Sequence, residues 1–411
     1  MSFKDLYIIK PLLRAVADSG YNEPTLIQQR CIPPIIEKKD VIASAQTGTG
    51  KTAGFALPIL QLLFDKQDAP KRGKKARALI VSPTRELAVQ INENFKTYAK
   101  YTNLRSAVLF GGTSIEPQID ILKKGVDILI ATPGRLLDLH KQDYVNLDYI
   151  EIFVLDEADL MLDMGFIDDV KKIERLCPET KQVLLFSATI PFKVEQLASS
   201  ILKDPQRIDV TPNKSIASDI SQILYYVPKR NKIELCLHLL RNTIKGNILI
   251  FRRTKFGVDK LEKTLLKNSY KVDSIHGDKS QTDRQTALNK FKNGYVNILI
   301  ATDVAARGID IKELDAVVNF DLPNVPETYV HRIGRTGRAG NIGTAYSLCS
   351  ADEKTYIKNI QSSISVQIPI EENHPYPLDP KAKPIVHKKQ GSKYKKGRKG
   401  AGAKKKKKRW Y

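Results

Sequence analysis

The chain has 411 residues, of which 42% are hydrophobic and 27% charged, and its formal net charge is +22. This length predicts two or three domains, and this composition is typical of a globular protein. No apolar run approaches the roughly 18 residues of a membrane span. Four widely spaced cysteines without a C-x-x-C pair indicate neither a zinc site nor a disulfide framework, so we expect free thiols in a reducing cytoplasm.

Residues 1–20 distribute charges among their apolar positions, which predicts an amphipathic helix and not a signal peptide. Further along, short apolar runs alternate with helix-like segments, a pattern typical of strands buried in parallel sheets. The runs are DVIASAQ, ALIVSPT, DILIATP, IFVLDEA and VLLFSAT in the first half, and NILIFRRT, KVDSIHG, NILIATD and AVVNFDL in the second. The similarity of DILIATPGR to NILIATDVA indicates two halves built on one plan.

The polar segment 209–221 contains a proline and has no clear period, so we predict the linker there. The predicted fold class is α/β, with one parallel-sheet domain at 1–208 and another at 222–375, followed by a tail at 376–411. Ligands of such sheets bind outside the carboxyl ends of the strands. The motifs described next mostly begin where an apolar run stops.

The first motif, VIASAQTGTGKT, is a strand followed by a glycine-rich turn and a helix pattern. It departs from a strict P-loop because Ala45 takes the place of the first glycine. Gly48 and Gly50 allow backbone N–H groups to turn toward phosphate oxygens. Lys51 would reach the β- and γ-phosphates, and Thr52 would bind Mg²⁺. The alternative is a chance Gly-Lys-Thr turn.

The second motif, IFVLDEADLMLD, ends an apolar strand in three carboxylates that repel one another. Asp156 fits the acidic residue that holds Mg²⁺ in a P-loop site, and Glu157 would orient and deprotonate the attacking water. The positive charges facing them would be Mg²⁺ and Lys51. An acidic helix N-terminus stabilised by the helix dipole explains Asp159 alone.

The third motif, HRIGRTGRAG, supplies Arg332, Arg335 and Arg338 in a sharp, glycine-containing turn. Arginines neutralise the charge of a phosphoryl-transfer transition state. The ATP site of the first half would then be completed by these arginines of the second half only when the two halves close on one another. These arginines could equally line a nucleic-acid groove.

Taken together, the motifs resemble those of a DEAD-box RNA helicase over nearly all of residues 1–375. The literal tetrad Asp156-Glu157-Ala158-Asp159 is present. The other matching strings are GYNEPTLIQ, AQTGTGKT, PTRELA, Gly111-Gly112, TPGR, SAT, QTDR, ATDVAARGID and HRIGRTGR, in the family's order. FRRT departs from a more usual neutral stretch.

The resemblance implies two tandem RecA-like domains that bind ATP and Mg²⁺. The residues that it implies for nucleotide binding are Phe3, Tyr21, Gln28, Ala45, Gln46, Thr47, Gly48, Thr49, Gly50, Lys51, Thr52 and Asp310. Among these, Gln28 would pair with the adenine edge, Phe3 would stack on the ring, and Asp310 would meet the ribose. Arg335 and Arg338 would be the transition-state arginines. The residues implied to couple the tetrad to domain closure are Asp159, Ser187, Thr189 and His331.

The resemblance also implies RNA as the partner. The residues that match RNA-gripping positions are Arg85, Gly112, Thr132, Arg135, Gly277, Arg284 and Thr302. Contacts to the backbone carry little sequence information, so we predict poor base specificity. The resemblance implies local opening of short duplexes or remodelling of RNA-protein complexes. The chain looks most like the small bacterial RhlE-type members, which assist ribosome assembly, RNA decay or growth in the cold. We expect a monomer.

The end of the chain carries fifteen of the positive charges, because residues 381–411 contain fifteen Lys and Arg and no Asp or Glu. This leaves +7 for residues 1–380. Almost nothing in it is apolar, so we predict a disordered basic tail that binds RNA electrostatically. A solubilising tail and a nuclear-localisation signal are the alternatives.

Two other functions stay open on the residues alone. An ATP-gated RNA clamp or assembly scaffold would use the same motifs with little unwinding. A DNA helicase would show the same spacing and charge, because the contact to the 2′-hydroxyl depends on detailed geometry.

Overall fold

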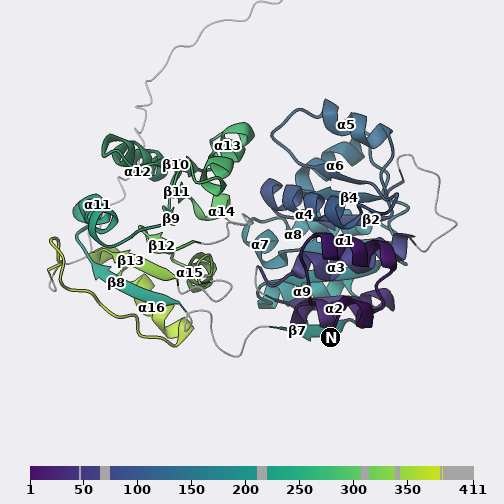
Figure 1. Ribbon diagram of the computed structural model, residues 1–411, viewed down its shortest axis with the longest axis horizontal. Helices are drawn as coiled ribbons and strands as arrows, with labels where there is room; N and C mark the ends of the chain where they lie inside the picture. Colours follow the sequence, from purple (N-terminus) through teal and green to yellow (C-terminus); the bar gives the residue numbers. More distant parts are fainter. Residues whose placement is uncertain are drawn as a thin grey trace, which may run out of the picture.

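The computed structural model describes residues 1–45, 48–64, 75–210, 220–306, 314–337, 343–379 and 382. The chain forms two halves that lie side by side, each a parallel sheet surrounded by helices (Figure 1). The predicted linker 209–221 lies outside the described residues except for its ends.

The first sheet has the strand order β3-β4-β2-β5-β6-β1-β7, and all of its pairs are parallel. Its strands are β1 (Val41–Ser44), β2 (Ala78–Val81), β3 (Ser106–Leu109), β4 (Ile128–Ala131), β5 (Ile152–Asp156), β6 (Gln182–Ser187) and β7 (Gln206–Asp209). The five predicted strands are confirmed. The sequence did not predict β3 and β7, because both are edge strands that are not continuously buried: β3 alternates between half-buried and buried positions, and β7 is mostly exposed.

The helical segments of the first half follow in chain order. They are η1 (Phe3–Leu6), α1 (Lys10–Asp18), α2 (Leu26–Ile36), α3 (Lys51–Phe64), α4 (Arg85–Tyr98), α5 (Glu116–Lys123), α6 (Pro133–Lys141), α7 (Ala158–Asp163), α8 (Ile167–Arg175) and α9 (Phe192–Ile201). The predicted N-terminal helix is thus a short 3₁₀ turn followed by α1. Apolar side chains of α1 to α4 pack on one face of the sheet, and those of α6, α8 and α9 pack on the other.

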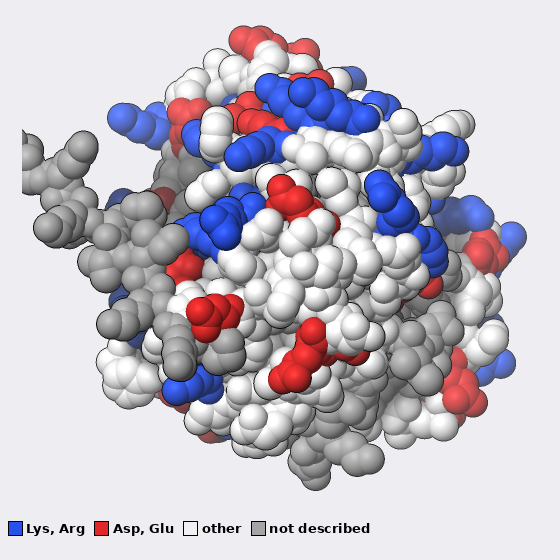
Figure 2. All heavy atoms as spheres, turned by 90° about the vertical axis from the view of Figure 1, so that its left-hand side faces the viewer, with Lys and Arg blue, Asp and Glu red and all other residues white. Residues whose placement is uncertain are grey.

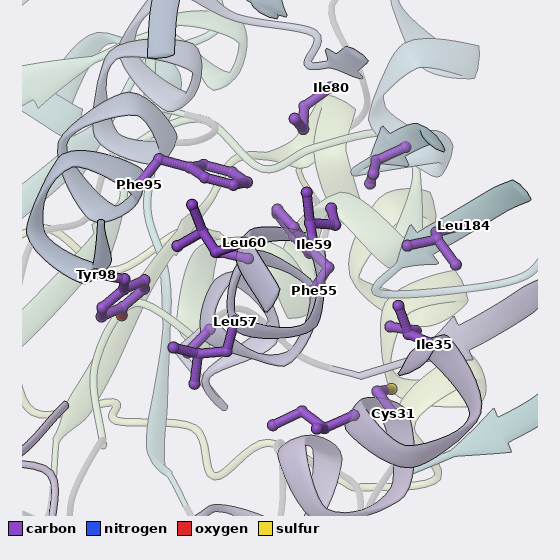
Figure 3. Packing of buried hydrophobic residues seen from close by; sticks show 14 of the residues in the cluster. Cys31, Ile35, Phe55, Leu57, Ile59, Leu60, Ile80, Phe95, Tyr98 and Leu184 are labelled. Carbon is purple, nitrogen blue, oxygen red and sulfur yellow. The ribbon is translucent and has the colours of Figure 1, made fainter. Parts of the chain in front are cut away.

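The core between α3 and the sheet places the phosphate-binding loop, because this loop joins β1 to α3. Figure 3 shows side chains of α3 between α2 on one side and α4 on the other. Phe55 is fully buried, with ring centroids 5.1 Å from Phe186 of β6 and 6.3 Å from Phe95 of α4. Burying such a side chain stabilises the fold by about 1.5–3 kcal/mol. This packing fixes the start of α3 against the sheet.

The second sheet has the strand order β10-β11-β9-β12-β13-β8, again with parallel pairs. Its strands are β8 (Ser221–Tyr226), β9 (Ile248–Phe251), β10 (Val272–Ile275), β11 (Ile298–Ala301), β12 (Ala316–Asn319) and β13 (Thr344–Cys349). The four predicted strands are confirmed. The sequence did not predict β8, an edge strand with an exposed position, or β13, whose buried run includes Ser347. The hydroxyl of Ser347 accepts a hydrogen bond from Asn319 at 3.3 Å.

The second half contains its own set of helical segments. They are η2 (Lys229–Asn231), α11 (Lys232–Asn242), α12 (Lys255–Lys267), α13 (Gln281–Lys292), α14 (Asp303–Ala306), α15 (Pro326–Ile333), η3 (Ala351–Glu353) and α16 (Lys354–Ile364). Side chains of α11 and α12 pack on one face of the sheet, while α13 and α14 contribute to a separate cluster with β10 and β11. The second half therefore has its own core.

The predicted start of the disordered tail, residue 376, lies a few residues too early in the sequence. After α16 the chain returns along β8, where the N–H of Leu224 donates to the carbonyl of Pro369 at 2.8 Å and its carbonyl accepts from the N–H of Glu371 at 2.9 Å. Further on, Leu378 donates to the carbonyl of Tyr226 at 3.1 Å. Backbone hydrogen bonds and apolar contacts therefore order the chain to Asp379. The rest of the predicted tail, except residue 382, lies outside the described residues.

Two expectations from composition concern cysteines and membranes. All four cysteines are free and buried. Within the described ranges, no helix has the length and apolar character that crossing a membrane requires.

Candidate active site and nucleic-acid groove

The phosphate-binding loop turns sharply between β1 and α3. Gly48 and Gly50 have φ angles of 87° and 93°, a left-handed conformation that glycine adopts without steric strain. A Cβ added to Gly50 would lie 2.4 Å from Nε2 of Gln28, so the packing also requires glycine there. The loop delivers Lys51 as the first residue of α3.

Several of the predicted nucleotide ligands surround this turn. Ala45 is fully buried, while Thr49 and Thr52 are half-buried at the end of the loop and the start of α3. The backbone N–H groups of a helix N-terminus attract phosphate, so this turn fits a phosphate group. The predicted ligands Gln46 and Thr47 lie outside the described residues.

Lys51 forms a buried ion pair with Glu157. Its Nζ donates to Oε1 of Glu157 at 2.8 Å, and the two side chains are only 5% and 10% exposed. Desolvation opposes the charged amine, but the charges of Glu157, Asp156 and then Asp159 outweigh it and raise the pKa of Lys51. Lys51 is therefore the cation that makes three neighbouring carboxylates tolerable.

Asp156, at the end of β5, fits the predicted Mg²⁺ ligand. Burial raises the pKa of its carboxyl to about 7; Lys51 opposes this rise and Glu157 adds to it. Its Oδ1 is buried and has no hydrogen-bond partner in the described part of the chain. A divalent cation would satisfy this oxygen and favour its ionised form.

A cation at Asp156 would need ligands beyond the protein's own acids and histidines. In the ranges that the structure describes, no group of three or more His, Cys, Asp or Glu is arranged to hold a metal ion. Mg²⁺ is usually bound by one or two carboxylates together with phosphate oxygens and water. The arrangement therefore fits Mg²⁺ that arrives with a nucleotide.

Glu157 itself has an unusual backbone conformation. It stands between β5 and α7 with φ 57° and ψ 55°, in the left-handed region. Non-glycine residues in such conformations cost about 1–3 kcal/mol and cluster at functional sites. The turn aims the carboxylate of Glu157 at Lys51 and away from the helix that follows.

A hydrogen-bond network joins the acidic tetrad to the end of β6. The backbone N–H of Asp159 donates to the hydroxyl of Ser187 at 3.1 Å. The backbone N–H and the hydroxyl of Thr189 both donate to Oδ2 of Asp159, at 3.0 and 2.9 Å. Three of the four residues predicted to couple hydrolysis to domain movement are thus connected, because Ser187 and Thr189 each form hydrogen bonds with Asp159.

The predicted adenine-binding residues are arranged differently from the expectation. Gln28 is 4% exposed; its Oε1 accepts the N–H of Thr25 at 2.9 Å, and its Nε2 donates to the carbonyl of Gly50 at 3.2 Å. Gln28 therefore contacts the phosphate-binding loop directly. Phe3 is only 4% exposed and packs in the core, so its placement does not support stacking on adenine; Tyr21, by contrast, is exposed.

A groove of about 580 Å³ lies between the two halves. Four of the predicted RNA-binding residues line it: Arg85, Thr132, Arg135 and Arg284. The guanidinium of Arg85 lies over Gly112, where an added Cβ would come within 2.1 Å of Nη2, so a side chain there would displace the arginine; the φ of 74° at Gly112 also favours glycine. This explains why these two predicted positions occur together.

The two halves contact one another at this groove. Nη2 of Arg284 lies 3.0 Å from Oε1 of Glu86, and Nε2 of Gln281 donates to the same oxygen at 3.2 Å. Burial, followed by the positive charges of Arg284 and Arg135, lowers the pKa of Arg85, whereas Glu86 raises it. Mutually repelling arginines from both halves form a site where phosphate would relieve the repulsion.

Other predicted RNA-binding positions lie on the second half. Gly277 lies between β10 and α13, and Thr302 directly follows β11. A Cβ at Gly277 would meet no atom within 4 Å, and its φ is not left-handed, so the fold itself does not require glycine there. Neither residue is among those lining the groove.

The arginines of the third motif have different roles. Arg332 does not supply a free cation for phosphate: it is 2% exposed, pairs with both oxygens of Asp303 at 2.5 and 2.8 Å, and also donates to Asn319. Burial of a charge requires such pairing. Arg335 is buried and borders a small cavity together with His331. Arg338 and Asp310 lie outside the described residues.

Sequence reasoning did not select two residues that the structure shows to be central. Glu86 joins the two halves, and Asp303 holds Arg332. Both stand inside strings that carry the resemblance, PTRELA and ATDVAARGID, so their position was the available signal. Nothing in those strings indicates which distant residue each acid would meet.

The fold and site define a class: a P-loop nucleotide hydrolase with two parallel-sheet domains and a basic groove between them. Residues 25–197 match the model of the DEAD/DEAH box helicase family, and residues 231–340 match the helicase conserved C-terminal domain. The chain is 40% identical over 367 residues to the DEAD-box ATP-dependent RNA helicase RhpA of Helicobacter pylori, covering 89% of this chain and 73% of that protein. It is 42% identical over 360 residues to CshA of Bacillus anthracis, a DEAD-box ATP-dependent RNA helicase, covering 88% and 67%. The chain belongs to the DEAD-box family of ATP-dependent RNA helicases.

Solved structures match both halves together. Dbp5 of S. cerevisiae bound to RNA and ADP BeF3 is similar with a TM-score of 0.81 and 31% identity, covering 90% of this chain and 95% of that one. Mss116p bound to ssRNA and AMP-PNP gives a TM-score of 0.82 and 30% identity over 90% and 78%. The fold is therefore two RecA-like domains, and the chain is an RNA-dependent ATPase that uses ATP with Mg²⁺. The names of these relatives do not test the narrower RhlE-type resemblance, which stays a prediction.

Proposed function

We propose that the chain remodels short RNA duplexes by closing its two domains over one RNA strand when ATP binds. The observation that supports this proposal best is the contact between Glu86 and Arg284, because it joins the domains at the groove where Arg85 and Arg135 also lie. Phosphate in this groove would favour closure by relieving the repulsion among the arginines.

The catalytic residues would act by exchanging partners. Lys51, held by Glu157 before the nucleotide arrives, would move to the phosphates and free the carboxylate of Glu157 to orient and deprotonate water. Thr52 and Asp156 would hold Mg²⁺, which supplies neutralising charge. Arg335 and Arg338 would come from the second domain.

The same assignment explains how RNA would be gripped. Arg85, Arg135 and Arg284 would contact phosphates, and Gly112 would admit the backbone closely. Phosphate contacts position a protein on nucleic acid but carry no sequence information. We therefore propose little base specificity and opening of one short duplex at a time, without long translocation. Unwinding that persists along long duplexes in single-turnover assays would contradict this.

The cellular setting is proposed from the bacterial relatives and the composition. We propose a cytoplasmic monomer whose work includes ribosome assembly, with residues 381–411 tethering RNA through fifteen uncompensated charges. Deleting these residues should weaken RNA binding and flatten its salt dependence. An unchanged salt slope would leave the solubilising role for the tail.

The experiment that tests this function is the steady-state ATPase rate with no nucleic acid, with single-stranded RNA, and with DNA of the same sequence. We expect stimulation by RNA, and in Glu157→Gln a loss of at least about 100-fold, the usual scale for a general base. Glu93→Gln, at an exposed surface pair, is the matched control. Equal stimulation by DNA would overturn the choice of RNA, and no stimulation by either would favour the clamp.

A further inference from the structure

The outer face of α12 carries a stripe of exposed side chains that the site described above does not use. The stripe consists of Phe256, Lys260, Lys263 and Lys267, whose spacing of three and four residues places them on one face of the helix. At 1.5 Å per residue, it runs about 16 Å along α12. Val258, Leu261 and Leu265 are fully buried against the sheet, so the stripe belongs to the solvent side.

The lysines of this stripe are not neutralised by neighbours. Among the residues that the structure describes, no carboxylate lies within ion-pair distance of Lys260, Lys263 or Lys267, as the observed ion pairs involve other residues. The two acids of α12 are already engaged on the adjoining turn. Asp259 accepts from His276 at 2.9 Å, and Glu262 lies 3.3 Å from Lys279. The stripe therefore presents net positive charge to solvent.

Figure 2 views the molecule from the end that carries α11 and α12. Lys and Arg side chains form a band near the top of this view, at the height where Figure 1 places α12, with some acidic side chains beside and above it. Such a basic band is a typical electrostatic footprint of nucleic-acid binding.

The stripe begins beside the turn that leads into the groove. Lys255, the first residue of α12, pairs with Asp278 at 2.6 Å, and Asp278 directly follows Gly277. The same turn leads into α13, whose Arg284 lines the groove. A phosphate backbone leaving the groove past Gly277 would therefore meet α12 at Phe256 and could follow the lysines.

Phe256 distinguishes this stripe from a merely solvated charged face. Its side chain is 76% exposed at the start of the helix, next to Lys255 and one turn before Lys260. An exposed aromatic ring costs solvation free energy, and bases stack on such rings with little preference for sequence. Cations at helical spacing with an aromatic at the groove end are suited to a nucleic-acid strand.

We propose that the α12 stripe is a second RNA-binding track, which holds the RNA segment flanking the groove. The proposal rests on the RNA helicase function described above and extends it, because it gives the enzyme a preference for RNA longer than the groove. An acidic protein segment is the competing occupant, and it would be indifferent to RNA length.

The test compares three full-length proteins: the wild type, the triple variant Lys260→Gln, Lys263→Gln, Lys267→Gln, and a control with three exposed lysines of the first half changed, Lys10→Gln, Lys38→Gln, Lys124→Gln. The probes are a single strand just long enough for the groove, a longer single strand, and the short strand with a flanking duplex. Dissociation constants are measured over a range of salt concentrations, and ATPase stimulation is measured with the short strand.

We expect the stripe variant to match the wild type on the short strand in both affinity and ATPase rate. On the longer single strand, its slope of log affinity against log salt should fall by about 2, since each released phosphate contact contributes about 0.7. Equal behaviour of the stripe variant and the control on both extended probes would overturn the track. Failure of the wild type to respond to any RNA would overturn the function as well.

Phe256 gives an independent readout. Phe256→Ala should weaken binding of the longer single strand by roughly fivefold or more, the usual scale for one base stacked on an aromatic ring. Phe256→Tyr should restore the affinity, and the short strand should bind all variants alike. An unchanged affinity of Phe256→Ala for the longer strand would overturn the stacking contact.

Discussion

The two halves share one framework but treat their buried charges in opposite ways. The similar strings DILIAT and NILIAT form β4 and β11, which occupy the second position of their sheets. In the second half, Arg332 is buried with its guanidinium bound by Asp303 and Asn319. In the first half, Asp156 is buried with one oxygen lacking a hydrogen bond in the described part of the chain.

In the first half, the buried charge lacks a partner that a ligand could supply. In the second half, the buried charge is already paired and stabilises the fold. The free oxygen and raised pKa of Asp156 cost stability, which a cation and phosphate would return on binding. The paired Arg332 instead fixes α15 against the sheet, and α15 leads directly to Arg335. The first half thus contains a candidate nucleotide site that is incomplete without its ligand. The second half places Arg335 at the end of a helix that is fixed against its sheet.

The largest effect is expected when the ion pair between Arg332 and Asp303 is removed. Arg332→Met should lower the free energy of unfolding by about 3 kcal/mol, the lower end for breaking a buried ion pair, because it leaves the half-buried Asp303 and the buried Asn319 without this partner. Chemical denaturation would measure the loss, with Arg241→Met on the exposed surface of α11 as the control. A loss no larger than that of the control would mean that the second half is not held by this pair.

In the first half, removal of the buried charge is expected to stabilise the protein. Burial raises the pKa of Asp156 from 3.8 to about 7, so its carboxyl favours folding when protonated. This contribution is fully present below pH 3.8, declines as the pH rises, and is lost above about pH 7. Without nucleotide, Asp156→Asn should therefore raise the melting temperature at pH 8 by at least about 2 °C, although we expect the same substitution to abolish ATP hydrolysis.

The pH dependence provides the control for this prediction. Near pH 4 the melting temperatures of Asp156→Asn and the wild type should converge. Asp120→Asn, at a carboxyl that is 68% exposed, should not show the same trend. A variant that is less stable than the wild type at pH 8 would show that Asp156 is satisfied in the free protein.

The smallest effect is expected from a substitution in the hydrogen-bond network that joins the acidic tetrad to the end of β6. Thr189→Val removes one of the two hydrogen bonds from Thr189 to Asp159, and a hydrogen bond to a charged group is worth about 1.5–3 kcal/mol. We expect RNA-stimulated ATP hydrolysis to change little while strand separation falls by roughly tenfold. Measuring both rates on one duplex substrate tests this; Thr97→Val, in an exposed local contact, is the control. Equal losses in both rates would assign Thr189 to hydrolysis.

Continuous apolar runs made most of the fold predictable. Strands such as β2, β4 and β9 are buried at every position, and this burial leaves a clear mark in the sequence. The edge strands β3, β7 and β8 leave no such mark, because part of each faces solvent. Predictability therefore mostly followed burial; the exception is β13, which is largely buried but whose apolar run is interrupted by Ser347.

The site was predictable where neighbours in sequence are neighbours in space. The order of Lys51 and Thr52 after two glycines indicated a phosphate loop, and Asp156 with Glu157 indicated its acidic partners. The pairing of Glu86 with Arg284 joins residues from different domains, and no local pattern encodes such a distance. The burial of Phe3 likewise depends on how the N-terminal segment packs.

The segment that returns along β8 has a practical consequence for shortening the protein. β8 is the last strand of its sheet, and residues 369–371 occupy its hydrogen-bonding edge next to Leu224. Without them, unpaired N–H and C=O groups would form a template for a strand from another molecule. A truncation made after Asp379 should stay dispersed, whereas one made before Pro369 invites self-association through this edge.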